Sequence, residues 1–256
     1  MFDPSTSDAK PTTNDSPIEV DTLSSPRRGF LRNVLGGLTV PAVLAATSGS
    51  AFAGKPRNRG GNGNGNRGGN GNARGGLPEL YPGANSRQFV TILEDENQHV
   101  GFLLGALGAN ARPLPTFQGL EQPDLVSFAL TSRAFENTGT GAYRGAAKYI
   151  NSPDYLDAAA SILAIEARHS GYLDALTNQV VTTNVLGNSP ALEAPLTIDQ
   201  IVKNVSPYVV SLNGGPPLTF STTPSAMNDI AILNFALALE FLEATYYEIN
   251  VPKFFR

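Results

Sequence analysis

The sequence of 256 residues contains no cysteine, which excludes disulfides and thiolate metal sites in any compartment. Histidine occurs only twice, each time in the same Glu-x-x-His motif, so no Ser-His or Cys-His pair is left for nucleophilic catalysis. A glycine-rich phosphate loop is missing too, because the only glycine-rich run lies in a spacer and follows no predicted strand. An enzyme built on these devices is therefore the least favoured class.

The first 53 residues carry the pattern of an export signal. Residues 1–26 are rich in Ser, Thr, Pro and Asp without an apolar period and are predicted to be disordered. Arg27 and Arg28 precede a short apolar stretch, LTVPAVLAA, and a run of small residues that ends at Ala53. These parts predict a twin-arginine signal cleaved after Ala53 and read by the twin-arginine export machinery. The apolar stretch is well short of the roughly 20 residues that a membrane span needs, so no span is expected.

Residues 54–76 consist almost wholly of Gly, Asn and Arg, which predicts a flexible, cationic linker. RGG-like runs can bind single-stranded nucleic acid, but this one lacks aromatic residues, so a tether is favoured and no nucleic acid is expected. Residues 77–256 are long enough for one domain with a sizeable core. This domain has 17 acidic and 9 basic side chains, a net excess of 8 negative charges that needs neutralising.

The two motifs are Glu96-Asn-Gln-His99 and Glu166-Ala-Arg-His169. On a helix, this spacing places the carboxylate and the imidazole on one face. Glutamate fills 11 of 256 positions, so chance would place it before both histidines in roughly one such chain in 500. The alternative, a surface salt bridge, suits a single pair better than two pairs that use every histidine. Paired Glu-x-x-His motifs supply half of each metal site in dinuclear carboxylate bundles, so we interpret both as metal-ligating.

Apolar spacing predicts four helices, over about residues 86–108, 124–150, 155–177 and from 226 to just before Pro252. In the first, Val90, Leu93, Asn97, Val100 and Leu104 trace an apolar stripe, with Glu96 and His99 beside it. In the second, Gly139 and Gly141 weaken the helix and suggest a bulge. The predicted fold class is all-α, a four-helix bundle.

A dinuclear bundle site also needs one glutamate from each of the other two helices. Glu136 is the internal carboxylate of the second helix, and the fourth offers Glu240, with Glu243 as the alternative. Tyr143 follows Glu136 by seven residues and Tyr247 follows Glu240 by seven, which suggests two related half-sites and favours Glu240. The tyrosines either support these ligands or pack in the core. Four carboxylates and two neutral imidazoles match two divalent ions, with iron or manganese favoured over copper(I).

The strings LNFALALEFLEATYY, EDENQHVGFL, FENTGTGAYRGAA and IEARH resemble the ferritin-like domain family that includes desiccation-related proteins. The resemblance implies a ferritin-like bundle, but in that family the LNFALALE-type helix comes first, so this chain resembles a circular permutation. The segment 109–123 would then be one long crossover, and the 45 or so residues 178–224 would be a second that packs along the bundle or covers one end.

The resemblance also limits the functions to be weighed. The leading hypothesis is a dinuclear iron or manganese protein that reacts with dioxygen or peroxide, like a di-iron oxidase or a manganese catalase or peroxidase. The competing hypothesis is a non-catalytic metal-binding or stress-protective protein of the periplasm, cell envelope or exterior. Ferritin-style storage is disfavoured by the tether and the long link. Because one bundle hosts many functions, the fold does not decide between these hypotheses. The sequence also leaves the oligomeric state open, a homo-oligomer included.

Overall fold

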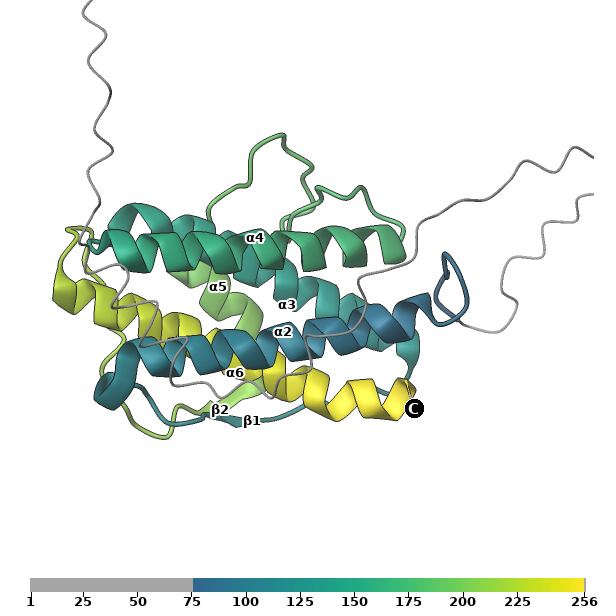
Figure 1. The fold of residues 1–256 in the computed structure, drawn as a ribbon, viewed down its shortest axis with the longest axis horizontal. Helices are drawn as coiled ribbons and strands as arrows, with labels where there is room; N and C mark the ends of the chain where they lie inside the picture. Colours follow the sequence, from purple (N-terminus) through teal and green to yellow (C-terminus); the bar gives the residue numbers. More distant parts are fainter. Residues whose placement is uncertain (1–75, 256) are drawn as a thin grey trace, which may run out of the picture.

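The computed structural model describes residues 76–255, and Figure 1 shows the bundle they form. The predicted export signal, and the linker up to residue 75, lie outside these residues. Three single 3-10 turns lie at Gly108–Asn110, Ala147–Tyr149 and Ser206–Tyr208. The main elements are α2 (Ala84–Leu107), β1 (Thr116–Phe117), α3 (Leu125–Ala146), α4 (Pro153–Leu176), α5 (Ile198–Val205), β2 (Val209–Ser211) and α6 (Ala226–Phe254). The predicted all-α fold is confirmed.

Short polar side chains start three of the long helices. Asp124, Ser152 and Ser225 each accept a hydrogen bond from a backbone N–H three residues on, which satisfies a donor that has no partner within the helix. The first long helix, α2, instead follows Gly83, whose φ of 78° is a left-handed conformation that suits glycine. Local sequence therefore sets where each helix begins.

Two predictions about the continuity of the helices were wrong. The helix α6 does not stop before Pro252 but continues to Phe254. Pro252 removes one backbone hydrogen bond, the one to the carbonyl of the exposed Glu248, and lies in the last turn, where only that single bond is lost. The helix α3 also runs without a bulge through Gly139 and Gly141. These glycines are needed for close packing: a Cβ on Gly141 would lie 2.5 Å from Cγ of Leu196 in the long link.

The four long helices form two antiparallel pairs, α2 with α6 and α3 with α4, as Figure 1 shows. Two hydrogen bonds show how the ends of α6 lie relative to the neighbouring segments. Asn234, near the start of α6, accepts from the backbone N–H of Arg112, just beyond the end of α2. Asn250, near the end of α6, accepts from the backbone N–H of Gln122, just before α3. The segment between α2 and α3 therefore runs the length of the bundle, as predicted for the first crossover.

The second long link, between α4 and α6, packs along the bundle as predicted. Leu196 is buried, and its backbone N–H donates to the carbonyl of Gly141 on α3. The helix α5 then packs on α3, and β2 pairs antiparallel with β1 of the first crossover. Both elements were absent from the sequence prediction. The helix α5 thus packs the second link onto the bundle, and the β1–β2 pairing joins the two crossovers.

The interior consists of a polar layer between two apolar clusters. One cluster centres on Phe89, Phe128 and Tyr246. The other includes Leu103 and Leu237, toward the opposite end of the bundle. All the residues of the predicted metal site are buried between them. The polar groups of this layer are therefore kept from bulk water, which strengthens every electrostatic interaction among them.

The predicted apolar stripe of α2 was wrong by about one residue. Val90 and Leu104 are 37% and 38% exposed, whereas Phe89, Ile92 and Leu103 are buried. Glu96 and His99 continue the buried row, so they lie in the middle of the core-facing side and not beside it. An apolar-only count misses this face because two of its central positions are polar.

Among the described helices, α6 alone is long and apolar enough to cross a membrane. Its most apolar window is 67% buried inside the bundle, and the helix carries the buried carboxyl groups of Glu240 and Glu243. These features are those of a core helix.

Candidate metal centre

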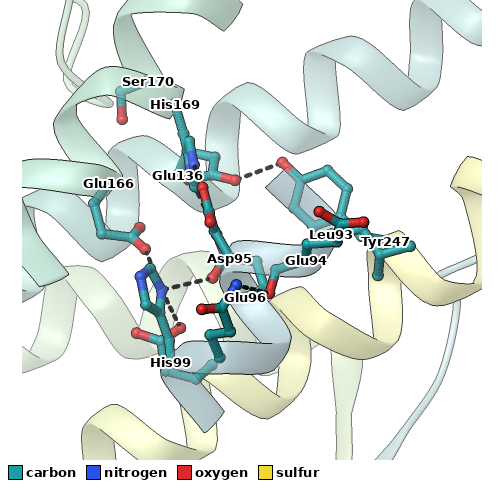
Figure 2. Close-up of polar contacts among 12 residues, drawn as sticks. Leu93, Glu94, Asp95, Glu96, His99, Glu136, Glu166, His169, Ser170 and Tyr247 are labelled. Atoms are coloured by element: carbon teal, nitrogen blue, oxygen red, sulfur yellow. Dashed lines mark hydrogen bonds and ion pairs between the residues drawn. The ribbon is translucent and has the colours of Figure 1, made fainter. Parts of the chain in front are cut away.

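Four helices bring together the six predicted ligands. Glu96 and His99 come from α2, Glu136 from α3, Glu166 and His169 from α4, and Glu240 from α6. The four carboxyl side chains are at most 1% exposed and the two histidines at most 8%. Figure 2 shows the side chains of Glu96, His99, Glu136, Glu166 and His169 gathered in the interior between the helices. The i, i+3 spacing achieves this on α2 and α4 because it keeps each Glu and His on one helix face.

The donor atoms form two overlapping groups. The first group takes one donor atom from each of four residues, and these atoms lie within 4.8 Å of one another: Glu96, His99, Glu166 and Glu240. In the second, Glu136 and His169 replace His99 and Glu240. Glu96 and Glu166 belong to both groups, and the two imidazole rings are 6.5 Å apart. The arrangement is that of two adjacent cation sites with two shared carboxylates.

Separations between donor atoms suit a small divalent ion. The Nδ1 atom of His99 lies 3.2–3.3 Å from a carboxylate oxygen of each of three glutamates. The Nδ1 atom of His169 lies 3.0 Å from Glu96 and 3.1 Å from Glu136. Ligands at right angles with bonds of about 2.1 Å are themselves about 3.0 Å apart. Each nitrogen therefore stands where a shared ion could bind it together with its neighbouring oxygens.

Two tyrosines hold carboxylates across the bundle. Tyr143 on α3 donates to Glu240 on α6 at 2.5 Å, and Tyr247 on α6 donates to Glu136 on α3 at 2.6 Å. The predicted seven-residue spacing pairs each Tyr with a Glu on its own helix, but the hydrogen bonds run between helices. The exchange is reciprocal, as expected of two related half-sites, and it fixes one oxygen of each carboxylate.

Two acidic residues near the centre extend the predicted set. Asp95, partly exposed, has a carboxylate oxygen 3.1 Å from Nε2 of His169, and so holds the ring nitrogen that faces away from the cluster. Its one sequence signal is its place directly before Glu96. Glu243 is buried like Glu240 but belongs to neither donor group. Glu240 therefore belongs to a donor group and Glu243 lies outside both groups, so Glu240 stays the predicted ligand.

Burial and mutual repulsion change the acidity of the glutamates. Burial, together with the charge of Glu136, raises the pKa of Glu96 to about 7. Burial and neighbouring carboxylates raise the pKa of Glu166 and Glu243 well above the usual range. Burial acts most strongly on Glu240 and raises its pKa, but the proximity and charge of His99, with the hydrogen bond from Tyr143, together outweigh burial and lower that pKa. Without bound cations, the layer keeps protons that free glutamates lose.

The histidines respond in the opposite way. Burial opposes the charged form of both, but hydrogen bonds and charge from the surrounding carboxylates outweigh burial and raise the pKa of His99 and His169. Protonated imidazolium therefore supplies part of the positive charge that the metal-free layer needs.

Gly139 makes room for the centre, and this gives a first prediction. A Cβ at this position would lie 2.5 Å from Oε2 of Glu166 and 3.3 Å from Oε1 of Glu243. We expect Gly139→Ala to destabilise the protein by about 1–3 kcal/mol in urea unfolding, because the methyl group displaces a packed carboxyl group.

The matched control is Gly105→Ala, on the exposed side of α2, where a Cβ meets nothing within 4 Å. This change is expected to stabilise by about 0.5–1 kcal/mol through helix propensity. A gain in stability at Gly139 as well would contradict the packing described.

A model of the ferritin-like domain family matches residues 42–179, more than half of the chain. The match includes α2, α3 and α4 and ends before α6, so the circular permutation and the narrower desiccation-related group stay predictions. No curated protein and no solved structure matches the chain. The family match agrees with the four-helix bundle and with its buried cluster of Glu and His. The chain belongs to the ferritin-like domain family.

Proposed function

We propose that this chain is an exported dinuclear metal protein that binds two iron or manganese ions and reacts with dioxygen or peroxide. The observation that carries the proposal is the pair of donor groups sharing Glu96 and Glu166. Glu96 and Glu166 would contribute to both ions, while His99 with Glu240 would hold one ion and His169 with Glu136 would hold the other. Two-metal sites place their ions about 3.5–4 Å apart, a separation that shared carboxylates provide.

Unsatisfied buried oxygens support the fit of a cation. One oxygen of Glu96, both of Glu166 and one of Glu240 are buried and accept no hydrogen bond of normal geometry. Buried acceptors without partners are costly, and a metal ion satisfies several at once. Two divalent ions also balance the four ligand carboxylates, so His99 and His169 act as neutral ligands. Carboxylate and imidazole donors suit iron and manganese.

Iron or manganese bound here would supply electron transfer to dioxygen or peroxide. The chain's own contribution is orientation and insulation. Tyr143 and Tyr247 hold one oxygen of Glu240 and Glu136, and Asp95 fixes the ring of His169. The apolar clusters on both sides of the layer limit access of water.

Turnover assays decide between catalysis and metal binding alone. Metal-loaded protein is expected to consume hydrogen peroxide or to oxidise ferrous iron faster than the same concentration of free metal. A protein that holds two ions and accelerates neither reaction belongs instead to the non-catalytic alternative, a metal-binding or stress-protective protein.

Export is supported by Arg27, Arg28 and the small residues ending at Ala53. The twin-arginine machinery would be the partner in export, with the periplasm, cell envelope or exterior as the destination. N-terminal sequencing of exported protein tests this, with Gly54 as the expected first residue. An exported protein that still begins at Met1 would contradict the signal.

The pH dependence of stability gives a second prediction. In the metal-free protein, the pKa of Glu96 is raised from its unfolded value of 4.5 to about 7, so the folded state holds a proton that the unfolded state loses. Stability is therefore expected to fall by about 3 kcal/mol as pH rises from 4.5 to 7. The raised pKa values of Glu166 and Glu243 also lower stability as pH rises. The raised pKa values of the two histidines continue this loss of stability above pH 6.5. The lowered pKa of Glu240 has the opposite effect, because its contribution to stability is lost as pH falls below 4.5.

The metal-loaded protein is the control for this pH series. Metal binding requires deprotonated ligands, so its stability is expected to rise over the same interval. Urea unfolding at several pH values measures both slopes. Parallel slopes with and without metal would contradict the assignment of these glutamates as ligands.

A further inference from the structure

A cavity of about 380 Å³ lies beside the centre, between the bundle and the second long link. Ile162 of α4 and Leu233 of α6 line its buried part, and Leu196 of the long link forms another wall. Its volume is within the range of small-molecule sites. The long link, whose role the metal centre leaves unexplained, is thus one wall of an internal compartment.

The walls of the cavity are mostly apolar. Most of the lining residues are aliphatic or aromatic, and Lys148 is the one charged residue among them. Lys148 and Thr222 are exposed and Ile198 is 41% exposed, so they mark the opening. The buried Asn228 is already bonded: it accepts from Ser221 and donates to the carbonyl of Tyr149. The interior therefore offers apolar contact, and the opening offers a cation.

We propose that this cavity binds the chain of a free fatty acid, with the carboxylate at Lys148 and the hydrocarbon inside. The volume accommodates about a dozen methylene-sized groups if each takes the roughly 30 Å³ of a water molecule in the liquid. That capacity fits one chain of medium length and excludes the two chains of a phospholipid. A charged head at the opening keeps its contact with water, while each buried methylene contributes to affinity.

Tyr143 connects this cavity to the metal centre. It lines the cavity, and its hydroxyl donates to Glu240. The hydrocarbon therefore lies against the tyrosine that holds a proposed ligand. The inference goes beyond the proposed function, because chain binding needs no metal ion and can be measured in its absence.

Titration calorimetry of the full-length protein with saturated carboxylates tests the inference, in metal-loaded and metal-free samples. From hexanoate to dodecanoate, affinity is expected to rise about three- to four-fold for each added methylene, then to level off or fall when the cavity is full. Binding of dodecanoate to metal-free protein supports the cavity even if metal binding fails. The absence of chain-length dependence, or of any binding by folded protein, overturns it.

Two substitutions locate the bound chain. Ala159 of α4 lines the cavity, whereas its neighbour Ala160 is exposed and does not. Ala159→Phe is expected to weaken dodecanoate binding at least ten-fold by filling the cavity, while Ala160→Phe leaves it unchanged. Equal effects at both positions would refute this location, and circular dichroism verifies that each variant is folded.

A third substitution tests the head group. Lys148→Met is expected to weaken dodecanoate binding about two- to five-fold, the range of an exposed ion pair, and to leave binding of dodecanol unchanged. An equal loss for dodecanoate and dodecanol would contradict the role of the Lys148 charge.

Discussion

Removing the metal ions from the purified protein is expected to lower its melting temperature by about 10–20 °C. Each ion present at 100 times its dissociation constant stabilises the folded state by about 2.7 kcal/mol, so two contribute about 5 kcal/mol. For a domain of this size, each kcal/mol shifts the melting temperature by about 2–4 °C. The buried carboxylate oxygens that accept no hydrogen bond give the physical reason, because a bound cation supplies the partner that they lack.

Thermal unfolding followed by circular dichroism, before and after chelation, measures the shift. Restoring iron or manganese to the chelated sample is the control for damage by the chelator, and it should recover the original melting temperature. Identical melting temperatures in all three samples would contradict a structural contribution of metal.

The substitution Glu166→Gln is expected to change stability in opposite directions with and without metal. Glu166 belongs to both donor groups, so the change should remove binding at both sites and with it about 5 kcal/mol of metal-dependent stability. In the metal-free protein, the same change removes a carboxyl group whose pKa burial and neighbouring charges raise. The variant should then be about 1–3 kcal/mol more stable than the metal-free wild type.

Urea unfolding of both proteins, with metal and with chelator, gives the four stabilities needed. The matched control is Glu94→Gln, an exposed carboxylate on α2 two residues before the first motif, which should leave all values nearly unchanged. A Glu166→Gln variant that is destabilised equally in both conditions would point to a purely structural glutamate.

The sequence was sufficient to predict the four long helices and the two Glu-x-x-His pairs, because both depend on short-range geometry. Glu96 and His99 share a face whatever the rest of the fold does, and the same holds for Glu166 and His169. Capping residues such as Asp124 likewise act over three positions. The four-helix class follows once these amphipathic segments must bury their faces together.

Features that depend on distant residues were missed. The hydrogen bonds of Tyr143 and Tyr247 cross between α3 and α6, so spacing within one helix indicates the wrong partner. Gly139 appeared as a weakness of its helix, whereas its lack of a side chain accommodates Glu166 from a different helix. Spacing along one helix carries no information about what another helix presents to it.

One missed element did have a local signal. Thr197 and Gln200 form a capping box at the start of α5, a pattern legible from the sequence. The helix has only eight residues, too few for apolar periodicity to be evident. The pairing of β1 with β2 had no such signal, because its partners are about 90 residues apart.

The metal content of the protein tests the central claim most directly. Protein purified from its native host, or reconstituted with iron or manganese and freed of loosely bound ions, is analysed by elemental mass spectrometry against protein concentration. The donor groups that share Glu96 and Glu166 predict about two ions per chain. Less than about one ion per chain, even after reconstitution, would contradict a dinuclear centre.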